Sequence, residues 1–550
     1  MKTKLSKTLI LFSATLLAAS SASAQTITKA DTTTMNTAAD WGGTAPALTQ
    51  TGVFTNVLSA PNAAALSLGG NVSLNRLDFQ NINGPVTIAS GNTLTLNNVT
   101  NATSAGIQMN NANLNHDVTI NAALANVGTI SVKTGRTLTL GGGATEIGGS
   151  AGAGRVILEN GNYTTTASVN LNVGDWSNPS TTGIVIGNSG NYSVSASLNI
   201  GRGANGIVRV NGTGAQFTAT PSNQDLFVGR DNTKGLLQVD AGTLAIGRAA
   251  SLGFQGSSEG ILRVNGGIAT VGTSLTVLNG ANNAAASGTF EVNGGTTTVG
   301  GAINLGTSST AGSANLTVTG GTLYIGQNGV GIATSGTGST THSITLSGGT
   351  IGSSTTTVGG GWSSSANMTL GTTNGDITFQ SANASSAARS IALSGQISGA
   401  GGLIKTGAGN LTLSGVNTYT GNTTVNAGTL ILSDNAGMTF NIGATGVNNQ
   451  ITGTGTVTLD GDFTFNLSGA AAVGTWNIVN VATLTETFGS TFSVIGFTDA
   501  GSNTWTRING GSTYTFSETT GLLTAIPEPS TWLLLTGTLT ALVVLRRRRA

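Results

Sequence analysis

The chain has 550 residues, of which 84 are glycine, none is cysteine and only 7% are charged. So much glycine without a Gly-X-Y period excludes collagen, and a hydrophobic fraction of 38% is too high for a disordered chain. The absence of cysteine excludes disulfides, thiol catalysis and cysteine-ligated metals. Such a chain must be stabilised by backbone hydrogen bonds and buried apolar side chains.

Residues 1–24 have the three parts of a secretory signal peptide. The basic start, the apolar run and the A-x-A cleavage site are, in order, Lys2, Lys4 and Lys7, then Leu9–Ala19, then Ala22, Ser23 and Ala24. Cleavage is expected before Gln25. A membrane anchor is the alternative, but the apolar run is short and ends in small residues. This segment predicts export through the Sec translocon.

Residues 25–64 are expected to cap the repeats that follow. They contain Asp40, Trp41, Gly42 and Gly43 in succession. A stack of repeats has an apolar end that must be covered, and a bulky aromatic side chain covers it well. We therefore expect Trp41 to be a buried cap and not a ligand platform.

Short runs of alternating apolar and polar residues begin at Ala65, separated by Gly and Asn turn dipeptides. Five similar segments start at Gly206, Gly235, Gly260, Gly288 and Ala314, with spacings of 29, 25, 28 and 26 residues. A period in this range indicates stacked supersecondary units, and no helical pattern accompanies it. Residues 65–440 are therefore predicted to form an all-β solenoid, a parallel β-helix of about 25–29 residues per turn. Antiparallel β-sandwiches are the alternative, because Gly/Asn turns also suit hairpins.

Charged side chains recur at one position of these repeats. Arg209 and Arg263 are equivalent, and Gln238 and Glu291 stand at the matching positions of neighbouring repeats. We expect them to form an exposed ladder with cross-turn ion pairs, each contributing little.

The most regular stretch is residues 401–432, GGLIKTGAGNLTLSGVNTYTGNTTVNAGTLIL. It resembles the autotransporter-associated β-strand repeat, because its glycines, Lys405, the NTYTG block at 417–421 and the GTL at 428–430 fall in register. The resemblance implies about one turn of a right-handed parallel β-helix on a surface or secreted protein. It implies no enzyme activity.

Residues 441–525 are expected to form a C-terminal β cap, because aromatic residues become frequent in 456–519. A carbohydrate platform is the alternative, since exposed aromatic rings can stack on sugars. The alternation in Phe463, Thr464 and Phe465 favours the cap.

Residues 526–550 combine a Pro-Glu-Pro triplet, an apolar run and a basic cluster: Pro527, Glu528 and Pro529, then Thr531–Leu545, then Arg546, Arg547, Arg548 and Arg549. As a helix the run would span about 22 Å, short of a ~30 Å hydrocarbon core unless the arginines snorkel. The tail resembles the PEP-CTERM sorting signal. This resemblance implies a transient inner-membrane anchor, removal near the triplet by an exosortase, and association with exopolysaccharide. A permanent single-span anchor is the alternative.

Residues that could carry chemistry are sparse. His116, next to Asp117, and His342 lie far apart, and Asp460 and Asp462 read as a turn between strands more simply than as a cation or acid–base pair. No HExxH, P-loop or EF-hand pattern is present. We therefore name no catalytic, cofactor or metal residue.

The charge balance argues against a nucleic-acid partner. Residues 25–526 hold 14 basic and 19 acidic side chains, a net charge of −5, and show no basic cluster. We expect an exported, non-enzymatic, adhesin-like protein of the cell surface or extracellular matrix in a Gram-negative-type bacterium. The alternatives are a β-helix polysaccharide lyase or hydrolase, and a glycan-binding module in the C-terminal cap.

Overall fold

The structure is a computed structural model that describes residues 25–528, apart from short internal gaps. The gaps are residues 31, 33, 49, 56–65, 97–104, 110, 126–128, 134, 141–144, 148–154, 160–161, 166–168, 172–182, 188, 196, 204, 221–224, 281, 308–310, 333–339, 358–359, 483 and 485–486.

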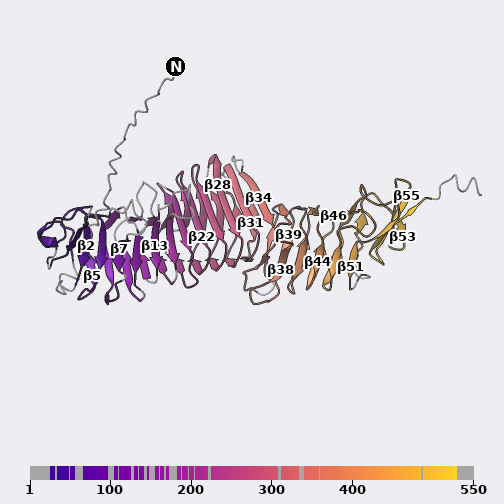
Figure 1. Ribbon diagram of the computed structural model, residues 1–550. Coiled ribbons are helices and arrows are strands. Elements are labelled where there is room, and N and C mark those ends of the chain that lie inside the picture. Colours follow the sequence, from indigo (N-terminus) through magenta and orange to yellow (C-terminus); the bar gives the residue numbers. More distant parts are fainter. Residues whose placement is uncertain are drawn as a thin grey trace, which may run out of the picture.

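The described chain coils into an elongated shaft in which strands pair in parallel with the strands one turn away (Figure 1). Each complete turn contributes one strand to each of three faces. One face is a single 16-stranded sheet, the spine sheet, and the other two are built from shorter sheets placed end to end. The prediction of an all-β parallel solenoid is confirmed, and the alternative of antiparallel sandwiches is wrong. The right-handed coiling stays a prediction.

The strands of the spine sheet are, in order, β5 (Val86–Ile88), β8 (Val118–Ile120), β11 (Thr137–Leu140), β14 (Asn162–Thr165), β17 (Asn191–Val194), β20 (Gln216–Ala219), β23 (Thr243–Ile246), β26 (Ile268–Val271), β29 (Thr296–Val299), β32 (Thr322–Ile325), β35 (Thr350–Ser353), β38 (Ile377–Asn383), β41 (Leu403–Thr406), β44 (Thr423–Val425), β47 (Ile451–Gly453) and β51 (Val479–Val481).

The second face consists of β1 (Gln25–Thr28), β2 (Gln50–Phe54), β4 (Arg76–Phe79), β7 (Ala105–Met109), β10 (Thr129–Val132), then β13 (Arg155–Glu159), β16 (Gly183–Gly187), β19 (Gly206–Val210), β22 (Lys234–Val239), β25 (Glu259–Val264), β28 (Asn282–Val292), β31 (Ala311–Val318), β34 (Thr340–Leu346), β37 (Met368–Leu370), β40 (Ile397–Gly399), then β43 (Val416–Asn417), β46 (Gly437–Asn441), β49 (Asp462–Asn466) and β52 (Ser493–Val494).

The third face consists of β3 (Val72–Leu74), β6 (Thr93–Leu96), β9 (Ala123–Ala125), then β12 (Thr145–Ile147), β15 (Val169–Leu171), β18 (Leu198–Arg202), β21 (Leu226–Arg230), β24 (Ala250–Phe254), β27 (Leu275–Asn279), β30 (Ile303–Leu305), β33 (Val330–Ile332), then β36 (Gly361–Ser364), β39 (Ser390–Leu393), β42 (Asn410–Leu413), β45 (Thr429–Leu432) and β48 (Thr456–Leu459).

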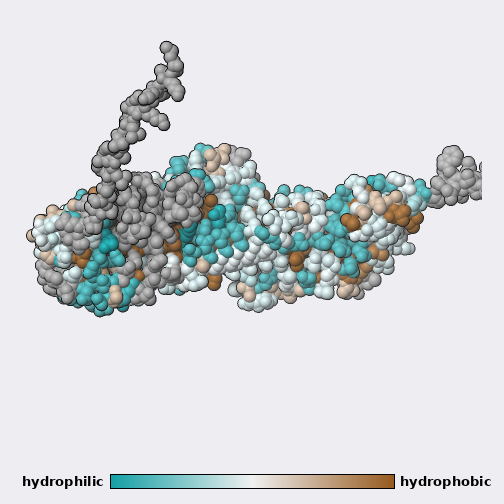
Figure 2. Space-filling model, viewed as in Figure 1, coloured by the Kyte–Doolittle hydropathy of each residue, from teal (hydrophilic) through white to brown (hydrophobic). Residues whose placement is uncertain are grey.

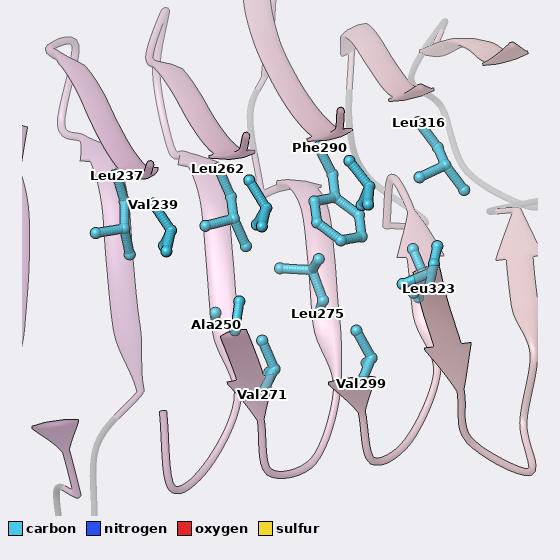
Figure 3. Close-up of a cluster of buried hydrophobic side chains, with 14 of the residues drawn as sticks. Leu237, Val239, Ala250, Leu262, Val271, Leu275, Phe290, Val299, Leu316 and Leu323 are labelled. Atoms are coloured by element: carbon cyan, nitrogen blue, oxygen red, sulfur yellow. The ribbon is translucent and has the colours of Figure 1, made fainter. Parts of the chain in front are cut away.

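The core is a set of columns in which like residues lie one turn above another (Figure 3). Leu237, Leu262, Phe290 and Leu316 are register partners in successive turns, and all four are buried. Alternation along each strand sends every second side chain inward. Burying each such side chain contributes about 1.5–3 kcal/mol, so stacking supplies the stability that a single turn lacks.

Glycines at one corner explain part of the unusual composition. Gly242, Gly267 and Gly295 end the turns that lead into successive spine strands and have left-handed φ values of 77°, 66° and 63°. A Cβ atom on Gly267 would lie 2.4 Å from the carbonyl oxygen of Gly242. Only glycine adopts this conformation without strain and allows the turns to stack so closely.

The N-terminal end is closed as expected. Trp41, in the 3₁₀ helix η1 (Ala39–Trp41), is 1% exposed and meets Phe54 edge-to-face, with 5.8 Å between ring centroids. Its indole Nε1 donates to the carbonyl of Met35 at 2.7 Å. The expectation of a buried aromatic cap is confirmed, and it excludes Trp41 as a ligand platform.

The parallel stack continues beyond residue 440, where a separate cap was expected to begin. Strands β46, β49 and β52 pair in parallel. An antiparallel sheet, the cap sheet, then closes this end in the order β50 (Gly474–Asn477), β56 (Leu522–Pro527), β55 (Ser512–Ser517), β54 (Thr504–Asn509) and β53 (Thr498–Gly501). Residues 441–525 therefore include both parallel turns of the shaft and the cap sheet.

The aromatic residues of this end face inward. Phe463, Trp476 and Phe516 are fully buried, and Phe463 and Phe516 lie 5.9 Å apart between ring centroids. These rings pack into the core at this end, and their burial argues against a sugar-stacking platform built on them. In the part of the chain that the structure describes, no helix is long and apolar enough to cross a membrane, and the expected segment 531–545 lies outside that part.

Candidate binding face

The outward side of the spine sheet carries two straight rows of uncharged and mostly polar side chains, interrupted by Ala245 and Ile268. The pairing register aligns one row as Thr87, Thr119, Thr139, Thr164, Ser193, Thr218, Ala245, Thr270, Thr298 and Tyr324. It aligns the second as Thr137, Asn162, Asn191, Gln216, Thr243, Ile268, Thr296, Thr322, Thr350 and Thr378. We call the two rows together the Thr/Asn face.

This face carries no charge. Among all residues of the sixteen spine strands, Lys405 alone has a charged side chain, and it points inward and is 0% exposed. With ~4.8 Å between neighbouring strands, the twelve strands from β5 to β38 present a neutral, mostly polar strip about 50 Å long. Hydroxyl and amide groups both donate and accept hydrogen bonds, so the strip can meet another uncharged polyhydroxylated surface.

A ladder of charged side chains lies on the second face, as the repeat alignment predicted. Arg209, Gln238, Arg263 and Glu291 are register partners in β19, β22, β25 and β28. Arg263 is ion-paired with Glu291, and Lys234 with Glu259 at 2.7 Å. The predicted ladder and its cross-turn pairs are confirmed. Because its charges compensate one another, this face offers no strong field to a charged partner.

A column of hydrogen-bonded polar side chains runs along the corner between these faces. Asn265 donates to Asp240 at 2.7 Å, Asn293 donates to Asn265 at 3.0 Å, and Thr319 donates to Asn293 at 2.7 Å. The column ties four turns together outside the core.

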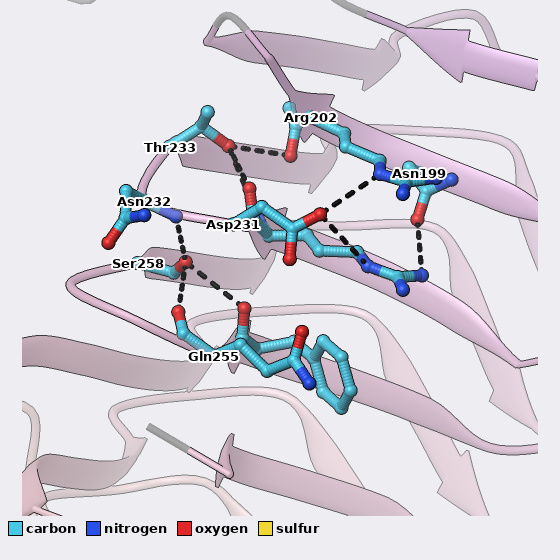
Figure 4. Close-up of polar contacts among 10 residues, drawn as sticks. Asn199, Arg202, Asp231, Asn232, Thr233, Gln255 and Ser258 are labelled. Atoms are coloured by element: carbon cyan, nitrogen blue, oxygen red, sulfur yellow. Dashed lines mark hydrogen bonds and ion pairs between the residues drawn. The ribbon is translucent and has the colours of Figure 1, made fainter. Parts of the chain in front are cut away.

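At another corner, a loop between β21 and β22 is held by charged and polar contacts (Figure 4). The Oδ2 atom of Asp231 accepts a hydrogen bond from Nε of Arg202 at 3.0 Å and lies 3.5 Å from Nε of Arg230. The guanidinium of Arg230 covers the rings of Phe227 and Phe254, at 4.6 and 5.0 Å from the centroids. Asp231 and Asn232 have left-handed φ values of 57° and 68°, which these residue types tolerate. These contacts hold the loop in shape, and its charged side chains are paired with one another.

The stretch 401–432 holds an unusual buried cation. The Nζ of Lys405 donates to the carbonyls of Thr406, Gly407 and Ala427 at 2.9, 2.7 and 2.8 Å. Burial lowers the pKa of Lys405 to about 8. The sequence pattern marked Lys405 as part of the motif, but it could not reveal that the side chain joins two successive turns from inside.

Asn417, also in this stretch, is fully paired in the core. Its Nδ2 donates to the carbonyls of Gly415 and Gly437 at 2.9 and 3.1 Å, and its Oδ1 accepts from the backbone N–H of Ile397 at 3.1 Å. These contacts join three turns, so the NTYTG block is a structural element of the shaft.

A second buried network lies beside Trp41. Asp40 accepts from the hydroxyls of Thr32 and Thr34 at 2.7 Å and from the backbone and hydroxyl of Thr37 at 2.8 Å. Burial alone would raise the pKa of this carboxyl, but the hydrogen bonds outweigh it and lower the pKa to about 2. This network was not predictable from the sequence pattern, because its threonines are scattered through a low-complexity segment.

The residues considered for chemistry do not converge. Asp117 lies 3.6 Å from Arg136, and His342 lies on β34, in a different part of the shaft. Asp462 accepts from Ser493, whereas Asp460 sits in the turn between β48 and β49. Among the described residues, no group of three or more His, Asp or Glu side chains could hold a metal ion.

Three of the predicted processing residues fall within the described chain. Gln25 is the first residue of β1 and pairs with Gln50. Pro527 ends β56, and the backbone N–H of Glu528 donates to Gly511 at 2.9 Å, with both residues exposed. Ala22, Ala24, Pro529 and Arg546, Arg547, Arg548 and Arg549 lie outside the described residues.

Comparison with known proteins gives two partial similarities. Residues 403–432 match the model of the passenger-associated-transport-repeat. A segment covering 40% of the chain is 28% identical over 247 residues to the adhesin BmaC autotransporter of Brucella suis biovar 1 (strain 1330). The match spans only 7% of that protein's length. No solved structure matches significantly.

Proposed function

We propose that this protein is a non-enzymatic, adhesin-like shaft exported to the surface of a Gram-negative-type bacterium. Support comes from the parallel solenoid, from the match of residues 403–432 to the passenger-associated-transport-repeat, and from the similarity to an autotransporter adhesin. The observation that carries the proposal is the uncharged Thr/Asn face on twelve aligned strands of the spine sheet, β5 to β38.

The Thr/Asn face would bind neutral glycan, such as exopolysaccharide of the surrounding matrix. Each turn adds a few hydroxyl or amide groups, and every one makes only a weak net hydrogen bond. Repetition along about 50 Å lets many weak contacts act together on one extended chain, as linked sites do. Because the Thr/Asn face carries no charge, it would favour uncharged sugars over acidic ones, which bind most strongly to cationic side chains.

Retention on immobilised polysaccharides tests this role. Purified protein should be retained by a neutral glucan more than by an acidic alginate. Raising the ionic strength from ~0.1 to ~1 M should leave retention on the glucan unchanged, because no ion pairs are involved. Loss of binding in salt would contradict the proposal, and release of soluble sugar fragments would favour the lyase or hydrolase alternative.

Residues 526–550 would sort the protein. We propose that the signal peptide is cleaved before Gln25 and that the tail holds the chain transiently in the inner membrane. An exosortase-type enzyme would then cut near Pro527, where Pro527 and Glu528 are exposed at the end of β56. In this scheme Arg546–Arg549 keep the far end of the apolar run in the cytoplasm.

Intact mass and cell fraction test the sorting. The native protein should start at Gln25 and end near Pro527, and deletion of Pro527–Ala550 should mislocalise it. A chain that keeps its C-terminus in the inner membrane would contradict processing and support a permanent anchor.

A further inference from the structure

The C-terminal cap exposes an apolar patch that the shaft does not use. Val447, Val473, Ile508 and Ile526 are 60%, 58%, 67% and 66% exposed. Figure 2 shows hydrophobic residues gathered at this end of the molecule, over the cap. We call these four side chains the cap patch.

Strand register places the members of the cap patch next to one another. Ile508 pairs with Thr513, and Thr513 pairs with Ile526, so the three form one row across β54, β55 and β56. Ala525 pairs with Gly474, which brings Val473 beside Ile526. The hydroxyl of Thr445 donates to the carbonyl of Val473 at 3.1 Å, which fixes the loop carrying Val447 against the same edge.

The patch faces away from the core. Tyr514 and Ala525 are 2% exposed, and each is adjacent in sequence to a residue of the Ile508–Thr513–Ile526 row. Because successive residues of a strand point to opposite sides, the row lies on the outer side of the cap sheet. Aliphatic side chains that stay this exposed in a group indicate a contact surface.

The position of the patch along the chain identifies what it contacts. Glu528 is still bonded to Gly511, and the apolar run begins at Thr531. Three residues span at most about 10 Å. Wherever the run enters a bilayer, the cap patch therefore lies close to the lipid surface.

We propose that the cap patch rests on the lipid surface while the tail is anchored, and so holds Pro527 and Glu528 at the level of the membrane. This contact rests on the membrane anchoring in the proposed function. Four aliphatic side chains inserted at the interface add apolar burial to the tail. Removal of the tail leaves a contact too small to retain the shaft, which is then released.

Site-specific fluorescence tests the contact, because the chain has no cysteine and a single introduced cysteine can be labelled. An environment-sensitive probe is attached at Ile508→Cys or Ile526→Cys in the full chain, reconstituted in phosphatidylethanolamine/phosphatidylglycerol vesicles that carry a lipid-borne quencher. Ile268→Cys is the matched control, because Ile268 is 52% exposed on the spine sheet, far from the cap. Quenching should be several-fold stronger at 508 and 526 than at 268.

Flotation of the vesicles separates the two claims. A chain that floats while its probes at 508 and 526 stay unquenched overturns the patch contact and leaves anchoring intact. A chain that does not float refutes the anchoring, and the contact with it. Probes that are shielded without vesicles would show that the tail or a second copy covers the patch, which also overturns the proposal.

Discussion

At the scale of single residues, the most informative group is a hydroxyl with no partner. Thr297 is fully buried in the column that joins Ala269 to Leu323, and its Oγ1 makes no hydrogen bond. Its neighbour Thr298 lies in the Thr/Asn face. The two threonines look alike in the sequence, and only alternation separates an inward from an outward role.

Thr297→Val should therefore stabilise the protein by about 1 kcal/mol, because it removes a buried unpaired hydroxyl without changing the shape of the side chain. Thr298→Val is the matched control and should change stability by less than about 0.5 kcal/mol. The two variants can be compared by urea unfolding. Destabilisation by Thr297→Val would mean that the hydroxyl has a partner.

Lys405 makes stability depend on pH in the alkaline range. Its pKa is about 8 in the folded chain and near 10.5 when unfolded, so the unfolded state binds more protons between these values. Stability from this group therefore rises as the pH increases from about 8 toward 10. The rise should vanish in Lys405→Met, measured as the difference between the thermal midpoints of the two proteins. An identical pH profile for both would contradict the assignment.

Asp40 makes stability depend on pH in the acidic range. Its folded pKa of about 2 lies below the ordinary 3.8, so its contribution is present above pH 4 and is lost as the pH falls toward 2. Asp40→Asn should lower stability at neutral pH, where the carboxylate accepts four hydrogen bonds, and should flatten the decline between pH 4 and 2. A variant that still declines as the parent does would show that other acids cause the loss.

At the scale of the elements, the corner glycines limit what each turn can tolerate. Gly267→Ala should destabilise the shaft by more than about 1 kcal/mol, because its φ is left-handed and its Cβ would meet the Gly242 carbonyl. Gly84→Ala is the control, because nothing lies within 4 Å of the Cβ that it would gain. Equal stability of the two variants in chemical unfolding would contradict the steric account.

The strands themselves were largely predictable from the sequence. Alternation at Leu94/Leu96 and the 25–29-residue spacing identified inward columns and the charged ladder at Arg263 and Glu291. The Thr/Asn face was harder to predict, because its rows depend on the register in which the spine strands of successive turns pair. The buried contacts of Asp40 and Lys405 were not predictable, because burial of a charged side chain depends on carbonyl groups that carry no sequence signature.

At the scale of the whole molecule, the shaft separates its chemistry by face. Its ion pairs lie on the second face and at the corners, while the outward side of the spine strands carries no charged side chain. The two ends differ as well, since the N-terminal end buries Trp41 and the C-terminal cap exposes aliphatic side chains. Such a division suits a rod that is held at one end and binds along one side.

The adhesive role of the Thr/Asn face can be tested most directly by placing charge on it. Beads coated with the protein are allowed to adhere to the neutral matrix polysaccharide, with Thr270→Lys/Thr298→Lys compared with Thr317→Lys, which adds its lysine beside Glu291 on the second face. Adhesion should fall several-fold in the double variant and stay unchanged in the control. Full adhesion by a folded double variant would contradict the claim that the neutral face is the binding surface.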